Sequence, residues 1–132
     1  KEKIKTSIIL ITHDLGVVAE VCSRINVMYG GQLVETGTTH DIFYNPKHPY
    51  TWGLLKSIPD INKGEEKQRL IPIEGQPPDL LNPPIGCPFY PRCEYAMKIC
   101  KEKRPTNTEI NENHKASCWL LHPQAPSVER GV

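Results

Sequence analysis

A histidine directly follows an apolar segment near the start of the chain, where it could lie beside a bound phosphate. Residues 7–11 read SIILI, and Thr12, His13 and Asp14 come next. A continuous apolar run of this length is typical of a strand buried on both faces of a parallel sheet. Ligands of such sheets bind beyond the carboxyl ends of the strands. We therefore expect His13 at a site for a phosphate-bearing ligand, although a lone histidine after a strand is often only structural.

Four of the five cysteines are clustered and could bind a metal. They follow the spacing C-x5-C-x6-C-x17-C at Cys87, Cys93, Cys100 and Cys118. Structural zinc sites favour closer C-x2-4-C pairs, whereas a four-iron cluster accepts wider and less regular spacing. Spacing alone leaves three alternatives open, namely an iron–sulfur cluster, a zinc ion, or thiols that are free or form disulfides. Cys22 lies apart from the others and is expected to be a small core residue.

Composition and charge disfavour several classes of function. The 132 residues include 16 basic and 15 acidic side chains, and the net charge of +1 does not predict a nucleic-acid-binding surface. No apolar run approaches the roughly 20 residues that are needed to span a bilayer. The start of the chain also lacks the pattern of a secretory signal. In a reducing compartment, clustered cysteines bind metals more often than they form disulfides.

The elements that would position His13 are short helices around a β-hairpin. Asp14 is a suitable N-cap for the first helix, and Gly30-Gly31 is typical of a tight turn between two strands. Thr38 or Thr39 can cap the next helix, and Pro49 is tolerated in the first turn of the one after it. The predicted elements after the strand at 7–11 are a helix over 15–22, strands over 25–29 and 32–36, and helices over 39–45 and 48–58.

The character of the chain changes after these helices. Charged residues dominate the stretch 60–69, which predicts a solvated linker. Seven of the 13 prolines then lie between residues 72 and 91. Such a segment cannot form regular ladders or helices, and it needs anchoring that the cysteines could supply. A short helix is expected over 94–102. The predicted division is a first domain over 1–59, a linker over 60–69, a Cys-rich extension over 70–122 and a frayed tail over 123–132.

Several motifs taken together resemble one family of transport proteins. The stretch from residue 7 to Gly37 resembles the last part of an ABC-transporter nucleotide-binding domain, in which the THD step at 12–14 is the switch loop. Later motifs resemble the C-terminal extension of oligopeptide/dipeptide ABC importer ATPases. These motifs are HPYTWGLLKSIP at 48–59, GQPPDL at 75–80, GCPFYPRC at 86–93 and HKASCW at 114–119.

The resemblance implies a fold and a function. The fold would be α/β, the C-terminal part of a P-loop ABC ATPase domain followed by a small irregular Cys/Pro-rich extension. His13 would contact the γ-phosphate of ATP, with ATP and Mg²⁺ bound by the intact protein. A [4Fe-4S] cluster is implied in the intact protein, with zinc or no metal as alternatives in this fragment. Its implied ligands are Cys87, Cys93, Cys100 and Cys118.

The resemblance also implies where the protein works and with which partners. It would lie peripherally on the cytoplasmic face of the cell membrane, with a second ATP-binding subunit and the transmembrane permease subunits as partners. The phosphate-loop pattern GxxxxGK[ST] does not occur in these 132 residues. We therefore expect this fragment alone to be inactive as an ATPase, and to self-associate through the open edge of the strand at 7–11. The alternative is a stand-alone metal-binding regulatory or interaction module.

The remaining polar residues are weaker candidates. His40 and His48 are expected to be surface or capping residues. His114, four residues before Cys118, could replace a thiolate as a metal ligand. Arg92 either stabilises an anionic cluster by its charge or points into solvent.

Overall fold

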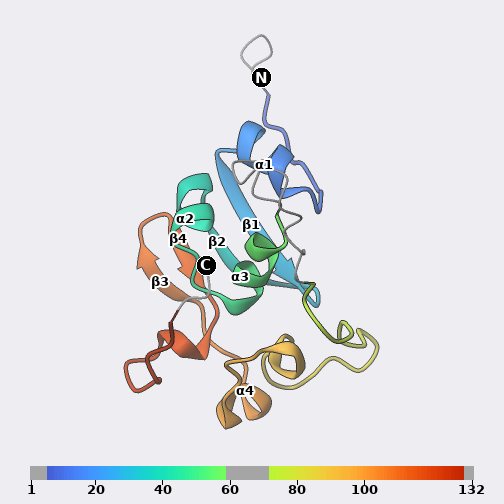
Figure 1. Ribbon diagram of the computed structural model, residues 1–132, viewed down its shortest axis with the longest axis vertical. Helices are drawn as coiled ribbons and strands as arrows, with labels where there is room; N and C mark the ends of the chain where they lie inside the picture. The colour runs from blue at the N-terminus through green and yellow to red at the C-terminus, as the bar shows by residue number, and fades with distance from the viewer. Residues whose placement is uncertain (1–5, 59–71, 130–132) are drawn as a thin grey trace, which may run out of the picture.

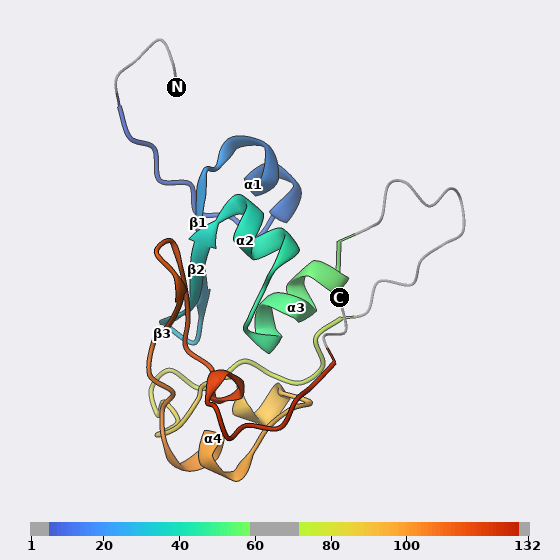
Figure 2. The same ribbon diagram turned by 90° about the vertical axis from the view of Figure 1, so that its left-hand side faces the viewer.

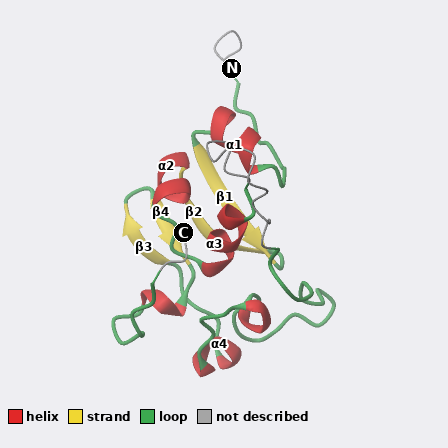
Figure 3. Ribbon diagram, in the orientation of Figure 1, coloured by secondary structure: helices red, strands yellow, loops and turns green. Residues whose placement is uncertain are grey.

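The computed structural model describes residues 6–58 and 72–129 of the chain. The elements are ordered as in Figure 1, and loops make up much of the second half of the chain (Figure 3). In chain order they are α1 (Leu15–Val21), β1 (Arg24–Tyr29), β2 (Gln32–Thr38), α2 (Thr39–Tyr44), α3 (Pro49–Lys56), the 3-10 turn η1 (Tyr90–Arg92), α4 (Lys98–Glu102), β3 (Thr108–Asn111), β4 (His114–Ala116) and the 3-10 turn η2 (Trp119–Leu121).

The predicted hairpin is confirmed as strands β1 and β2. The two strands pair antiparallel, with Tyr29 opposite Gln32. Gly30 and Gly31 have φ values of 54° and 74°, and a two-residue turn of this kind requires positive φ at both positions. A Cβ on Gly30 would also lie 3.0 Å from Pro88 Cβ. The turn therefore needs glycine for its backbone and for its close approach to the Cys-rich segment.

The helices begin where the sequence places suitable caps. Asp14 Oδ1 accepts hydrogen bonds from the backbone amides of Gly16 and Val17, at 2.9 and 3.2 Å. Thr38 and Asp41 form a capping box at the start of α2. These side chains satisfy backbone donors that have no partner in the first helical turn. The predicted helix over 94–102 is shorter in the structure, where only Lys98–Glu102 is helical.

A four-stranded antiparallel sheet joins the two halves of the chain. Its strand order is β1-β2-β4-β3, and Glu35 in β2 lies opposite Ala116 in β4. Strands β3 and β4 are not among the predicted elements. The predicted linker at 60–69 lies outside the described residues. The stretches on its two sides contribute strands to one sheet, with α1, α2 and α3 together on one side of it (Figure 2).

The hydrophobic core also draws on both halves. Ile25, Val27 and Tyr29 alternate along β1 as its buried residues. The Tyr29 ring lies 4.6 Å from the ring of Tyr50 in α3 and 5.1 Å from that of Phe89, measured between centroids. This aromatic cluster connects the hairpin, α3 and the cysteine-rich loop, and it stabilises their relative positions.

The prediction of a buried strand over residues 7–11 is wrong for this structure. The segment contains no strand, and Ile9 and Ile11 are 89% and 94% exposed. A strand buried on both faces needs neighbouring strands and covering helices. Among the described residues no strand pairs with this segment, so its apolar side chains are left in solvent. No helix in the described part of the chain is sufficiently long and apolar to cross a membrane.

Candidate functional site

His13 lies on an exposed turn immediately before α1. The Asp14 amide donates to Thr12 Oγ1 at 3.0 Å, and the Asp14 carboxylate then caps the helix. Both neighbours of His13 are thus engaged in shaping the turn, while the imidazole itself is exposed. Helices α1 and α4 lie at opposite ends of the molecule (Figure 1). The structure therefore separates His13 from the cysteines instead of combining them in one site.

All four clustered cysteines line one small cavity. Cys87, Cys93, Cys100 and Cys118 contribute to its wall, and none of them forms a disulfide. The cavity has a volume of about 10 Å³, which is the room that one water molecule needs. The sequence prediction that these four residues belong together is therefore supported by their convergence.

Backbone contacts hold the cysteine loops against one another. The Cys87 amide donates to the Cys100 carbonyl oxygen at 2.8 Å, which joins the loop before η1 to α4. The Trp119 indole Nε1 donates to the Lys103 carbonyl oxygen at 2.9 Å. This second bond ties the turn after Cys118 to the end of the same helix. Four thiols from three separate segments are thereby placed around one point.

Burial keeps three of these thiols protonated in the metal-free chain. Desolvation raises the pKa of Cys93 to about 11 and that of Cys118 to about 12, and it also raises the pKa of Cys87. A thiol with such a pKa is a poor nucleophile at neutral pH, and a bound cation is needed to displace its proton. The site is consequently not arranged as a reactive-cysteine centre.

The four cysteine sulfur atoms are chemically suitable ligands for a metal centre. Thiolates select soft or borderline ions and iron–sulfur clusters. The described residues nevertheless contain no group of three or more His, Cys, Asp or Glu side chains arranged to hold a metal ion. A centre larger than one ion would also require the surrounding loops to move apart. The structure thus shows converging sulfur donors without a formed ligand sphere.

His48 is buried against the same cavity. Its side chain is 1% exposed and lines the cavity together with the four cysteines. It caps α3, because its Nδ1 accepts from the Tyr50 amide at 3.1 Å. Burial lowers the pKa of His48 to about 4, so the ring is neutral at pH 7. Of the two roles expected for His48, surface or capping, the structure confirms capping, by a side chain that is buried.

Glu35 is the centre of a buried polar network that the sequence analysis missed. It is 2% exposed, and its two carboxylate oxygens accept four hydrogen bonds from three parts of the chain. The donors are the Lys47 amide at 2.6 Å, the His48 amide at 3.0 Å, the Thr51 hydroxyl at 2.6 Å and His114 Nε2 at 2.8 Å. This single carboxylate connects β2, β4 and the start of α3. A full set of donors is what allows a charge to be buried.

His114 and Arg92 each make specific contacts away from the cysteine cavity. His114 is fully buried against Glu35 and is not on the cavity wall of the cysteines, so it does not replace a thiolate. Arg92 is half-buried and is not among the residues that line the cysteine cavity. Its guanidinium donates to the carbonyl oxygens of Ile73 and Glu74, at 2.5 and 2.7 Å, and to Tyr29 Oη at 3.2 Å.

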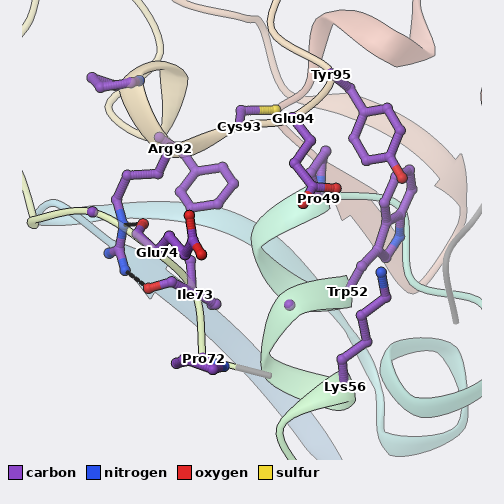
Figure 4. Close-up of a pocket in the computed structure, with 14 residues that line it drawn as sticks. Pro49, Trp52, Lys56, Pro72, Ile73, Glu74, Arg92, Cys93, Glu94 and Tyr95 are labelled. Atoms are coloured by element: carbon purple, nitrogen blue, oxygen red, sulfur yellow. Dashed lines mark hydrogen bonds between the residues drawn. The ribbon is translucent and has the colours of Figure 1, made fainter. Parts of the chain in front are cut away.

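A second, larger cavity lies beside the cysteine site (Figure 4). It has a volume of about 460 Å³ and is lined by α3, residues 72–75, Phe89 and residues 91–95. Trp52 and Tyr95 face each other on one side, and the Arg92 contacts to Ile73 and Glu74 close the other side (Figure 4). Arg92 thereby anchors the start of the proline-rich stretch.

The sequence matches the profile of a known family. The profile of the oligopeptide/dipeptide transporter family, C-terminal region, matches residues 34–100, which are 67 of the 132 residues. The chain therefore belongs to this family. The resemblance drawn from the sequence motifs is confirmed.

Individual relatives are similar over nearly the whole chain. The oligopeptide transport ATP-binding protein OppD of Bacillus subtilis is 57% identical over 98% of this chain and 36% of the relative. The dipeptide transport ATP-binding protein DppD of Lactococcus lactis is 51% identical over 97% of this chain and 36% of the relative. OppD of Haemophilus influenzae is 48% identical over 91% of the chain. The chain thus spans about a third of the length of these curated relatives.

Proposed function

We propose that this chain is the C-terminal part of an ATP-hydrolysing subunit that powers the import of oligopeptides or dipeptides. The observation that carries the proposal is the 57% identity, over nearly the whole chain, to an oligopeptide transport ATP-binding protein. The whole protein would bind ATP and Mg²⁺, pair with a second ATP-binding subunit and act on transmembrane permease subunits at the cytoplasmic face of the membrane. The exposed apolar segment at 7–11 would complete its strand in the larger sheet of that protein. In the separate chain, the same segment would pair with a second copy.

His13 would act as the switch histidine of the ATP site. An imidazole N–H can donate to a γ-phosphate oxygen, and phosphoryl transfer depends mainly on such positioning and charge stabilisation. The exposed ring and the stable turn around it support this role. When the γ-phosphate leaves, the contact is lost and the turn is released, which would couple hydrolysis to reopening of the subunit pair.

Replacing His13 by alanine in the full-length protein should lower the rate of ATP hydrolysis by about 100-fold or more, while ATP still binds. Phosphate release and nucleotide binding are the measurements. His40→Ala is the matched control, because His40 is also exposed but lies on α2, and it should leave the rate unchanged. Equal rates for the two variants would contradict the role of His13. The 132-residue chain alone should show no turnover.

The four cysteines would hold a thiolate-ligated metal centre, for which we propose a [4Fe-4S] cluster. Their convergence on one cavity supports the proposal, and the wide spacing favours a cluster over zinc. Such a centre would supply a covalent cross-link among loops that have few regular elements. Cys87, Cys93, Cys100 and Cys118 would then fix the proline-rich extension against the hairpin domain.

Cys118→Ser should abolish metal binding in full-length protein purified without oxygen. Metal analysis, sulfide analysis and visible absorbance provide the measurement, and a brown protein with iron and sulfide is the expected wild-type result. Cys22→Ser is the control, because Cys22 caps the end of α1 and is not on the cavity wall. A colourless wild-type protein that contains zinc would show that the centre is a zinc ion and not a cluster. A wild-type protein without metal would refute the metal centre.

A further inference from the structure

His48 is held by one hydrogen bond at its backbone and one at its ring. Its backbone amide donates to Glu35 Oε2 at 3.0 Å, and its ring Nδ1 accepts from the Tyr50 amide at 3.1 Å. A nitrogen that accepts a hydrogen bond carries no proton. The proton of this neutral imidazole is therefore on Nε2, which is the ring nitrogen farther from the backbone.

The Nε2–H group has no hydrogen-bond partner among the described residues, although it is fully buried. A buried donor of this kind costs free energy, and nearly all of them in native proteins are paired. An unpaired example calls for a specific explanation, such as a ligand that is bound in the working protein. The ring lies on the wall of the cysteine cavity, so a ligand bound in this cavity would lie next to it.

The other residues around the cavity narrow the choice of acceptor. Phe89 packs on the His48 ring at 5.9 Å between centroids and offers no lone pair. The Trp119 indole is a donor that is already used by the Lys103 carbonyl oxygen. Two tyrosines also line the wall, but among the described residues no oxygen or sulfur atom accepts a hydrogen bond from Nε2. The four cysteine sulfur atoms are the acceptors on this wall that a bound metal would make negatively charged. A neutral thiol accepts only weakly, whereas a metal-bound thiolate or sulfide carries negative charge and accepts strongly.

We propose that His48 is a positioning residue of the cysteine site, whose Nε2–H donates a hydrogen bond to a metal-bound sulfur. The inference rests on the metal centre put forward above. Donation to a coordinated sulfur withdraws negative charge from it, which stabilises the reduced state of a cluster and slows loss of the metal. Because the same residue binds Glu35 through its backbone, the buried polar network of the sheet and the metal site share one anchor.

Two substitutions separate the two roles of the imidazole, which are the capping of α3 through Nδ1 and hydrogen-bond donation through Nε2. His48→Asn retains an oxygen near the position of Nδ1, which can still cap α3, but it lacks a donor at the position of Nε2. His48→Gln carries an amide nitrogen near the position of Nε2 and is the conservative rescue. If His48 served only packing or capping, His48→Asn, which retains the cap, should hold the metal at least as well as His48→Gln. Hydrogen bonding to sulfur requires the opposite order.

The experiment uses the full-length protein, purified without oxygen with its metal. Metal release to an added chelator and, for iron, the reduction potential are measured for wild type and both variants. His48→Asn should retain the wild-type metal content but release it about 10-fold faster, with a lower reduction potential, and His48→Gln should restore both values in large part. The rate of metal release can be measured for zinc as well as for iron, so a zinc protein also tests the contact between His48 Nε2–H and a metal-bound sulfur.

The outcomes distinguish the two proposals. Equal release rates and potentials in wild type and His48→Asn, with metal present, would overturn the role of His48 and leave the metal centre standing. The same holds if His48→Gln behaves like His48→Asn. Wild-type protein without any metal would overturn both proposals together. Unfolding curves of the metal-free variants check that release is not faster because the chain has unfolded.

Discussion

Replacing Glu35 by alanine should lower the free energy of unfolding by about 3–5 kcal/mol, which is the usual effect of removing one partner from a buried charged network. The substitution leaves His114 Nε2, the Thr51 hydroxyl and the amides of Lys47 and His48 without their acceptor. His48, Thr51 and His114 are buried, so their donors lose the acceptor in a part of the protein that solvent does not reach in the folded chain. Denaturant unfolding followed by circular dichroism is the measurement.

Glu109→Ala is the matched control for this experiment. Glu109 is in β3 of the same sheet, where its exposed carboxylate pairs with Lys115 at 2.5 Å. Exposed pairs of this kind contribute little to stability, so this variant should unfold almost as the wild type does. Glu35→Gln should remain strongly destabilised, because its amide nitrogen faces donors in place of an acceptor. Similar unfolding curves for Glu35→Ala and Glu109→Ala would refute the central role of the buried carboxylate.

Gly86→Ala should disrupt the cysteine site directly. A Cβ at this position would lie 2.1 Å from the Cys100 carbonyl oxygen and 2.6 Å from that of Lys101. Both atoms belong to the backbone of α4 and cannot rotate away, so the helix must move. The Cys87 amide would then lose its bond to the Cys100 carbonyl oxygen. We expect a loss of about 2–3 kcal/mol in the free energy of unfolding and a strong reduction in bound metal.

The neighbouring position provides the comparison for Gly86. Ile85 is 83% exposed, so Ile85→Ala introduces the same side chain one residue earlier without entering the packed contact. It should retain both stability and metal content. Unfolding curves and metal analysis of the two full-length variants decide the matter, and a Gly86→Ala protein that matches Ile85→Ala in both would contradict the close contact between the loop and α4.

Local sequence signals predicted the local structure well. The caps of α1 and α2, the Gly30-Gly31 turn and the proline at the start of α3 all depend on interactions within a few residues. Such interactions do not depend on where the rest of the chain lies. The grouping of four cysteines could likewise be expected, because they are close in sequence and share one chemistry.

The strand at 7–11 was predicted on the same kind of signal but does not form. An apolar run predicts burial, and burial depends on partners that a strand cannot supply for itself. The described residues offer none for this segment, whereas the unpredicted strand β4 pairs with β2, and β3 pairs with β4. Edge pairing was decided by tertiary contacts and not by the intrinsic preference of either segment.

The sequence by itself therefore determined the family, the hairpin with its helices and the set of four cysteines. Only the tertiary structure revealed that Glu35, His48 and His114 form one buried network beside those cysteines. Glu35 and His114 are 79 residues apart. The sequence around a glutamate in a strand does not indicate which distant donors will surround its carboxylate. His114 reaches Glu35 only when β4 pairs with β2, and the donors from Lys47, His48 and Thr51 reach it when the start of α3 lies against β2. The physical reason is that tertiary contacts bring these donors together.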